Sequence, residues 1–310
     1  MLFFTWFRPA GLLAPFLLLS ACGDNTNSTT TASTAATAKT EVATTGTPLP
    51  QPKPPTPTGA PRILFVGNSH TAYYASIPEQ FRELCVYNKV PMNGELLVEM
   101  GISLHAIYQA DQEEAEALFA KTEADGNYFD YVVLQEQTPV VVDSAARYAD
   151  NLKLWTDKVR RHSPEAAVYV YQLASYDPYP EDSEGFNADH ALMREHTLAA
   201  LGQLPNAGLF RVGDAVKAAY EGGHGYQYRV AGHDNLRHGD NTQHLLNDGV
   251  FMASVLLYET LFGKQPQVPA EMTFSTGPGA DDNGRQALQP VAKAVSNPGA
   301  LAQIAWQYHR

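Results

Sequence analysis

The chain has 310 residues, of which 44% are hydrophobic and 17% charged, a balance typical of a folded globular protein rather than a disordered one. Asp and Glu number 33 against 21 Lys and Arg, so the formal net charge is −12. A surface of that sign repels phosphate backbones, and we therefore expect no nucleic-acid partner. The only cysteines are Cys22 and Cys85, which excludes a disulfide framework and a zinc site built from several thiolates.

The first 21 residues have the pattern of a secretory signal peptide. Arg8 precedes the apolar run 11–19, and small residues follow it. The run is shorter than the about 20 residues that cross a bilayer, and the alternative is an anchor made of all 21 residues. The segment Leu19-Ser20-Ala21-Cys22 resembles a bacterial lipobox. The resemblance implies an exported lipoprotein held in a membrane, expected to be the outer membrane, through lipid on Cys22.

Residues 22–60 are rich in Thr, Ser, Ala and Pro and show no apolar periodicity. Such a segment cannot bury enough surface to offset the entropy lost on ordering, so it is predicted to be a disordered linker. The folded body is expected to begin near Pro61. Residues 61–310 then form one α/β domain.

Short apolar runs predict five strands, at 62–66, 96–98, 131–134, 167–173 and 209–212. A helix face with Ile77, Phe81, Leu84 and Cys85 follows the first strand, and Cys85 is expected to be buried there. Apolar residues at helical spacing predict further helices at 104–121 and 145–161, within 189–204, from 214 to 220, and at 250–262. The segment 277–290 is predicted to be a loop, followed by a small helix. Strand–helix alternation predicts a parallel sheet covered on both faces, with ligands bound beyond the carboxyl ends of its strands.

The first strand is followed by Gly67-Asn68-Ser69-His70-Thr71. A serine directly after a strand and ahead of a helix can present its hydroxyl at the edge of the sheet. Its backbone N–H can then form part of an oxyanion hole. The alternative is a serine turn that only caps the following helix.

Residues 63–71, with the sequence ILFVGNSHT, resemble the first block of the SGNH (GDSL-type) hydrolases, in the variant with Asn before the serine. The resemblance covers residues 62 to about 263. It implies a flavodoxin-like three-layer α/β/α domain with about five parallel strands, and hydrolysis of esters, often of acylated sugars or lipids. It makes Ser69 the nucleophile and the first oxyanion donor.

Two further oxyanion donors are implied by the same resemblance. Gly101 holds the place of the glycine after the second strand, although a simple helix-entry glycine is the alternative. After the third strand the family has an Asn, whereas this chain has Gln135-Glu136-Gln137. Gln135 is the expected donor and Gln137 the second choice, because a Gln side chain offers the same N–H group on a longer arm. Both could instead only hydrogen-bond the loop backbone.

The general base implied by the resemblance is His244, which precedes the last predicted helix. The family has an acid three residues earlier, but that position is Asn241 here, and Asp240 comes one residue before it. A carboxylate is needed to orient the imidazole and stabilise its charged form, so Asp240 is favoured over Asp234. A Ser–His dyad assisted by a backbone carbonyl is the remaining alternative.

Several side chains that could bind a metal ion gather between residues 224 and 244. No pair has the His-x-x-x-His spacing that puts two ligands on one helical face, and a polar loop at the rim of the site is the simpler interpretation. We therefore expect neither metal nor cofactor. The ligands considered are His224, His233, His238, His244, Asp234 and Asp240.

Together these patterns predict a serine esterase acting on short acyl esters such as acetyl groups, on carbohydrate or on small molecules. Aromatic residues near the predicted cleft favour sugar substrates weakly, through stacking. They are Tyr73, Tyr74, Tyr176 and Tyr179. Two alternatives remain open: an O-acyltransferase acting on a cell-envelope polysaccharide, and a glycan-binding lipoprotein without catalysis. The sequence gives no indication of the oligomeric state.

Overall fold

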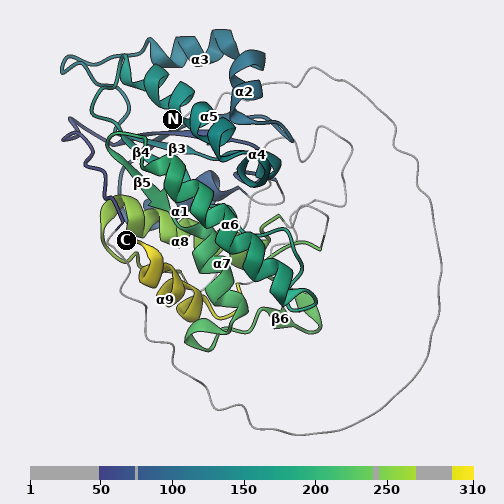
Figure 1. Cartoon of the computed structure of the whole chain (residues 1–310). Helices are drawn as coiled ribbons and strands as arrows, with labels where there is room; N and C mark the ends of the chain where they lie inside the picture. The colour runs from purple at the N-terminus through teal and green to yellow at the C-terminus, as the bar shows by residue number, and fades with distance from the viewer. Residues whose placement is uncertain (1–48, 74–75, 240–243, 270–294) are drawn as a thin grey trace, which may run out of the picture. The chain divides into compact units, whose positions relative to one another are not determined.

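The computed structural model describes residues 49–73, 76–239, 244–269 and 295–310. Five parallel strands form its central sheet in the order β2-β1-β3-β4-β5, which is the flavodoxin-like order that the sequence predicted (Figure 1). All but β2 are buried along almost their whole length, as expected for a parallel sheet covered on both faces. The strands are β1 (Arg62–Gly67), β2 (Asn93–Val98), β3 (Tyr131–Leu134), β4 (Ala167–Tyr171) and β5 (Ala207–Phe210).

The helices pack as two groups, one on each face of the sheet (Figure 1). The first group contains α1 (Ile77–Tyr87), α7 (Val212–Tyr220), α8 (Asn247–Phe262) and α9 (Pro298–Tyr308). The second contains α2 (Leu104–Ala110), α3 (Gln112–Phe119), α4 (Thr138–Asp143), α5 (Ala145–Arg160) and α6 (Ser183–Leu201). A short 3-10 turn, η1 (Gly223–Gly225), and a hairpin of β6 (Arg229–Val230) and β7 (His233–Asp234) lie between α7 and α8.

Helix α8 is apolar on all sides and almost entirely buried, because it lies between the sheet and helices α1 and α9. The Tyr131 hydroxyl of β3 donates to the Leu261 carbonyl at the end of this helix at 3.2 Å. Cys85 of α1 is fully buried, as predicted, and burial raises the pKa of its thiol to about 12. No helix in the described ranges has both the length and the apolar character that crossing a bilayer needs.

Element boundaries differ from the predictions where local breaks interrupt an apolar pattern. The single helix predicted at 104–121 is two helices, α2 and α3, because Asp111 leaves the helical conformation with φ −115° and ψ 32°. Strand β2 begins at Asn93, ahead of the predicted 96, and α4 follows β3 where no helix was predicted. The predicted loop at 277–290 lies outside the described residues, and α9 is the small helix expected after it.

The packed unit begins at Leu49, earlier than the expected start near residue 61. The Lys53 N–H donates to Asn206 Oδ1 at 2.7 Å, and Asn206 Nδ2 returns a bond to the Lys53 carbonyl at 2.9 Å. Pro52 is buried against Gly208 of β5, where a Cβ atom would overlap the proline ring. The proline-rich residues 49–60, called the strap below, thus pack against the domain as an extended segment. They lack the apolar periodicity by which helices and strands are predicted.

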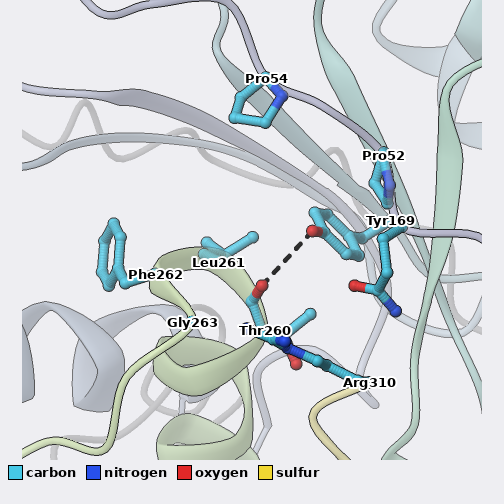
Figure 2. Close-up of a pocket in the computed structure, with 9 residues that line it drawn as sticks. Pro52, Pro54, Tyr169, Thr260, Leu261, Phe262, Gly263 and Arg310 are labelled. Carbon is cyan, nitrogen blue, oxygen red and sulfur yellow. Dashed lines mark hydrogen bonds between the residues drawn. The ribbon is translucent and has the colours of Figure 1, made fainter.

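This strap borders an open pocket of about 340 Å³ at the end of α8 (Figure 2). The Tyr169 hydroxyl donates to the Thr260 carbonyl there at 3.4 Å. His244 lies just before the other end of this 16-residue helix, which is about 24 Å long at 1.5 Å per residue. The pocket is therefore remote from the candidate site. Its lining consists of Gln51, Pro52, Pro54, Tyr169, Thr260, Leu261, Phe262, Gly263 and Arg310.

Candidate active site

Three loops meet at the carboxyl edge of the sheet, after β1, β2 and β3. They carry Ser69, Gly101 and the run Gln135–Gln137, respectively. Strand β1 lies between β2 and β3, and the chain reverses its direction of winding between β1 and β3. Ligand sites in doubly wound sheets form at this switch point. The topology therefore brings these candidate residues to one edge of the sheet.

Asn68 fixes the loop that carries Ser69, a role that the sequence analysis did not assign to it. Its side chain is buried, and its Nδ2 group donates to the Ile102 carbonyl of the β2–α2 loop at 3.0 Å. Its carbonyl accepts the Thr71 N–H at 2.9 Å, and its own N–H donates to Gln135 Oε1 at 2.8 Å. One residue thus joins the loop after β1 to the loops after β2 and β3.

Ser69 is partly exposed and is the residue of this loop left with unused polar groups. Among the described residues, none is hydrogen-bonded to its hydroxyl, and none accepts a bond from its backbone N–H. The same holds for the N–H of Gly101, which is exposed on the neighbouring loop. Two N–H groups on adjacent loops are therefore available to an outside acceptor, as an oxyanion hole requires.

Two glycines allow these loops to form, for different reasons. Gly101 has a φ of +74°, a conformation that side-chain-bearing residues adopt at a cost, and a Cβ there would meet nothing within 4 Å. Gly67 is needed for space instead, because a Cβ would lie 2.7 Å from Gln135 Oε1 and closer still to Thr71 Oγ1. At Gly67 glycine is therefore required by crowding between the loop after β1 and Gln135.

The two glutamines after β3 have different environments. Gln135 is fully buried; its Oε1 accepts the Asn68 N–H and the Thr71 hydroxyl, the latter at 3.1 Å, and its Nε2 donates to the Glu136 carbonyl. Through these bonds the Gln135 side chain holds the loop that carries Ser69. Gln137 is partly exposed, and its Nε2 donates to the Gly101 carbonyl at 2.6 Å. Of the two predicted candidates, Gln137 is thus the one that is partly exposed and bound to Gly101, whose N–H is open.

His244 lies just before α8, in a stretch, residues 244–246, that pairs with residues 236–238. Its carbonyl accepts the His238 N–H at 2.7 Å, and Arg237 pairs with Leu245 in an isolated antiparallel bridge. The imidazole is buried, with its ring centroid 5.0 Å from that of His70 and 4.4 Å from that of Tyr73. These two residues follow Ser69 in the loop after β1, so the predicted base reaches the loop of the predicted nucleophile.

Arg237 anchors this segment from within the protein. It is almost fully buried, and its guanidinium donates to the Tyr220 hydroxyl at 2.8 Å and to the carbonyls of Asp177, at 3.1 Å, and Ser175. Asp234, the lesser candidate for the acid, accepts the Arg237 N–H at 3.1 Å and the Tyr220 hydroxyl at 2.7 Å. The Asp234 carboxylate therefore stabilises the chain at Arg237. Asp240 and Asn241 lie outside the described residues.

Aromatic rings form one side of the site. His70 stacks on Tyr176 with centroids 5.9 Å apart, and its Nε2 lies 3.4 Å from Thr138 Oγ1. Tyr179, which was also expected near the cleft, packs instead against Phe186 and Tyr220, with centroids 5.5 and 5.0 Å away. Tyr74 lies outside the described residues.

The histidines weighed as metal ligands do not converge. Within the ranges that the structure describes, no group of three or more His, Cys, Asp or Glu side chains is arranged to hold a metal ion. His224 Nε2 lies 3.2 Å from Gln307 Oε1, whereas His233 belongs to the small hairpin of β6 and β7. His244 is the histidine of this set whose ring contacts His70 and Tyr73 among the described residues.

No protein-family model matches the sequence, and no curated protein is similar to it. Solved structures with a similar fold include a DUF4886 family protein from Bacteroides uniformis, at 15% identity over 81% of this chain and 96% of that one, with a TM-score of 0.46. A member of the lipolytic G-D-S-L family from Veillonella parvula is 16% identical over 66% and 100%, also with a TM-score of 0.46. A variant of an acetyl xylan esterase from Geobacillus stearothermophilus is 11% identical over 68% and 99%, with a TM-score of 0.45. Identities this low transfer no activity or site residue to this chain.

Proposed function

We propose that the protein is a serine esterase. One observation carries the proposal: Ser69 has a hydroxyl and an N–H that no described residue uses, on a loop that His244 contacts through its neighbours His70 and Tyr73. A nucleophile, a base and open N–H donors at one edge of a parallel sheet are the components that acyl transfer requires.

In the proposed reaction His244 takes the Ser69 proton as the serine oxygen bonds to the ester carbonyl carbon. The carbonyl oxygen becomes an oxyanion, held by the N–H groups of Ser69 and Gly101 and by the second N–H of Gln137 Nε2. Collapse breaks the bond to the alcohol, which leaves with the proton from His244. Water then adds to the acyl-serine, gives its proton to His244, and releases the acid as Ser69 regains its proton. We assign orientation of the imidazole to Asp240.

We favour Gln137 over Gln135 as the side-chain donor because of their surroundings. The Gln135 amide is enclosed and bonded to the loops after β1 and β3, so it would have to abandon those bonds to reach a substrate. Gln137 uses one of its two Nε2 hydrogens on the Gly101 carbonyl. The other hydrogen has no acceptor among the described residues, so it can be donated to a substrate.

The proposed substrate is a short acyl ester on a carbohydrate. Tyr176 and Tyr73 are partly exposed and lie beside the two imidazoles of the site, and tyrosine rings are suited to stacking on sugar rings. Transfer to a sugar acceptor rather than to water would use the same residues. Product analysis with an acetylated oligosaccharide, with and without an unmodified acceptor, distinguishes hydrolysis from transfer.

The site of export and attachment is also a proposal. We infer from the lipobox-like segment that Cys22 is acylated after signal-peptide removal and that the protein faces the periplasm or the cell surface. Labelling of cells with an alkyne-bearing fatty acid should mark the wild-type protein and leave Cys22→Ser unmarked. Equal labelling of both would refute the attachment.

The proposed activity is tested with p-nitrophenyl acetate and a fluorophosphonate probe. Wild type should hydrolyse the ester and be labelled on the peptide that contains Ser69, whereas Ser69→Ala should lose both. Thr122→Ala is a matched control, because it removes an exposed hydroxyl between α3 and β3, at the opposite edge of the sheet. Equal rates for wild type and Ser69→Ala would refute the proposal.

A further inference from the structure

Glu136 is a fully buried carboxylate that the proposed reaction does not use. It lies between the two glutamines of the loop after β3. Its Oε1 accepts two backbone N–H groups, those of Leu104 at 3.0 Å and of Gln137 at 2.7 Å. Its Oε2 accepts Asn151 Nδ2 at 2.7 Å. One side chain thus binds the start of α2, the start of α4 and the middle of α5.

All three partners of this carboxyl group are donors, so the ionised form satisfies every one of them. A protonated carboxyl would carry a hydrogen that none of these three groups can accept. Burial raises the pKa of Glu136, and the bonds from Asn151, Gln137 and Leu104 oppose that rise. Distributing the charge over three N–H donors makes a buried carboxylate tolerable, and the charge of Arg147 also opposes the rise in the pKa.

The two backbone bonds fix the loops that carry the open donor groups. Leu104 is three residues beyond Gly101, and the intervening Ile102 carbonyl is held by Asn68. Gln137 is bound to Glu136 through its backbone and to the Gly101 carbonyl through its side chain. The Glu136 carboxylate therefore links the loop after β2 to the loop after β3, and this link sets the distance between the two loops.

We propose that Glu136 is a positioning residue, whose carboxylate aligns the Gly101 N–H and the Gln137 amide for the oxyanion of the reaction. The inference rests on the proposed esterase function and extends it to a residue that touches neither substrate nor reacting atoms. Donors that are displaced by about 1 Å lose much of their effect on the transition state, and such displacements cost about 10²-fold in rate. The loss should fall on kcat and leave KM nearly unchanged, because the oxyanion exists only after attack.

Substitutions can separate alignment from charge. Glu136→Ala removes all three bonds and should lower kcat about 10²-fold. Glu136→Gln keeps an oxygen for the two backbone N–H groups, and its new NH2 group meets the Asn151 amide, which must turn over to present its oxygen. Glu136→Gln with Asn151→Asp restores a donor–acceptor pair there and places the charge on the other partner. Both the single and the double Gln variants should retain kcat within about fivefold of wild type.

The experiment measures kcat and KM with p-nitrophenyl acetate for wild type and the three variants, with urea unfolding to confirm that each is folded at the assay temperature. Hydrogen exchange of peptides covering 99–104 and 135–138 reports the alignment itself. Faster exchange in Glu136→Ala, with kcat lowered, KM retained and rescue by Gln, is the expected result. Wild-type kcat in Glu136→Ala, or no rescue in either Gln variant, would overturn the inference.

Failure of the underlying function gives a different pattern. Wild type would then show neither turnover nor labelling of Ser69, whatever residue stands at position 136. If Glu136→Ala does not fold, the two Gln variants still decide, because their side chains fill the same volume. A 10²-fold loss of kcat in both of them would again overturn a role in alignment.

Discussion

Glu259 of α8 provides the sharpest test of the electrostatics of this fold. The side chain is fully buried, and neither of its carboxyl oxygens has a hydrogen-bond partner among the described residues. Burial raises the pKa of this carboxyl to about 8, from an ordinary value of 4.5. The folded protein therefore keeps the proton across a pH range in which the unfolded chain has lost it.

The sign of the effect follows from proton binding. Between pH 4.5 and about 8 the folded state holds one more proton than the unfolded state, so the free energy of unfolding falls as pH rises. The slope is about 1.4 kcal/mol per pH unit for one group. Between pH 5.5 and 7.5 the wild type should lose about 2.5 kcal/mol through Glu259, a large part of the about 5–15 kcal/mol that stabilises a typical domain.

Urea unfolding of wild type and Glu259→Gln at pH 5.5, 6.5 and 7.5 measures this slope. Gln has nearly the same shape and does not titrate, so the difference between the two curves should change by about 2.5 kcal/mol over the range, in favour of the variant at high pH. Glu195→Gln, on the exposed side of α6, is the control and should leave the slope unchanged. Parallel curves for wild type and Glu259→Gln would refute the reasoning.

Four further substitutions test the site and the stability of the fold. Gln137→Ala should lower kcat for p-nitrophenyl acetate by about 10²-fold with little change in the urea midpoint, whereas Gln135→Ala should lower the midpoint; the reverse pattern would assign the donor to Gln135. Gly67→Ala should destabilise the fold by about 1–3 kcal/mol by crowding the loop after β1, as read from thermal unfolding. Although burial opposes ionisation, hydrogen bonds and the Arg211 guanidinium hold the pKa of Asp214 well below its usual range. Asp214→Asn should therefore cost about 3 kcal/mol at pH 7, and the difference from wild type should shrink as pH falls through the ordinary carboxyl range.

Much of the fold could be predicted because buried parallel strands leave continuous apolar runs. The runs at 62–66 and 131–134 became β1 and β3 with boundaries within one residue. The helix predicted at 104–121 was wrong as one element, since Asp111 interrupts it without disturbing the apolar spacing on either side. The strap at 49–60 was not recognised, because proline packing depends on the surface it meets.

The amino-acid sequence by itself determined which residues stand at the carboxyl edge. Strand ends are local features, so apolar runs predicted that Ser69, Gly101 and the run after β3 each follow a strand, and the resemblance to the SGNH hydrolases grouped them as one site. Only the tertiary structure decided which groups the side chains of Gln135, Glu136 and Gln137 bind. Beyond the last strand residue the chain turns, and the direction of each side chain then depends on contacts with residues more than thirty positions away. The approach of His244 to the first loop was decided in the same way, because it depends on a segment held by a buried arginine far from that loop in the sequence.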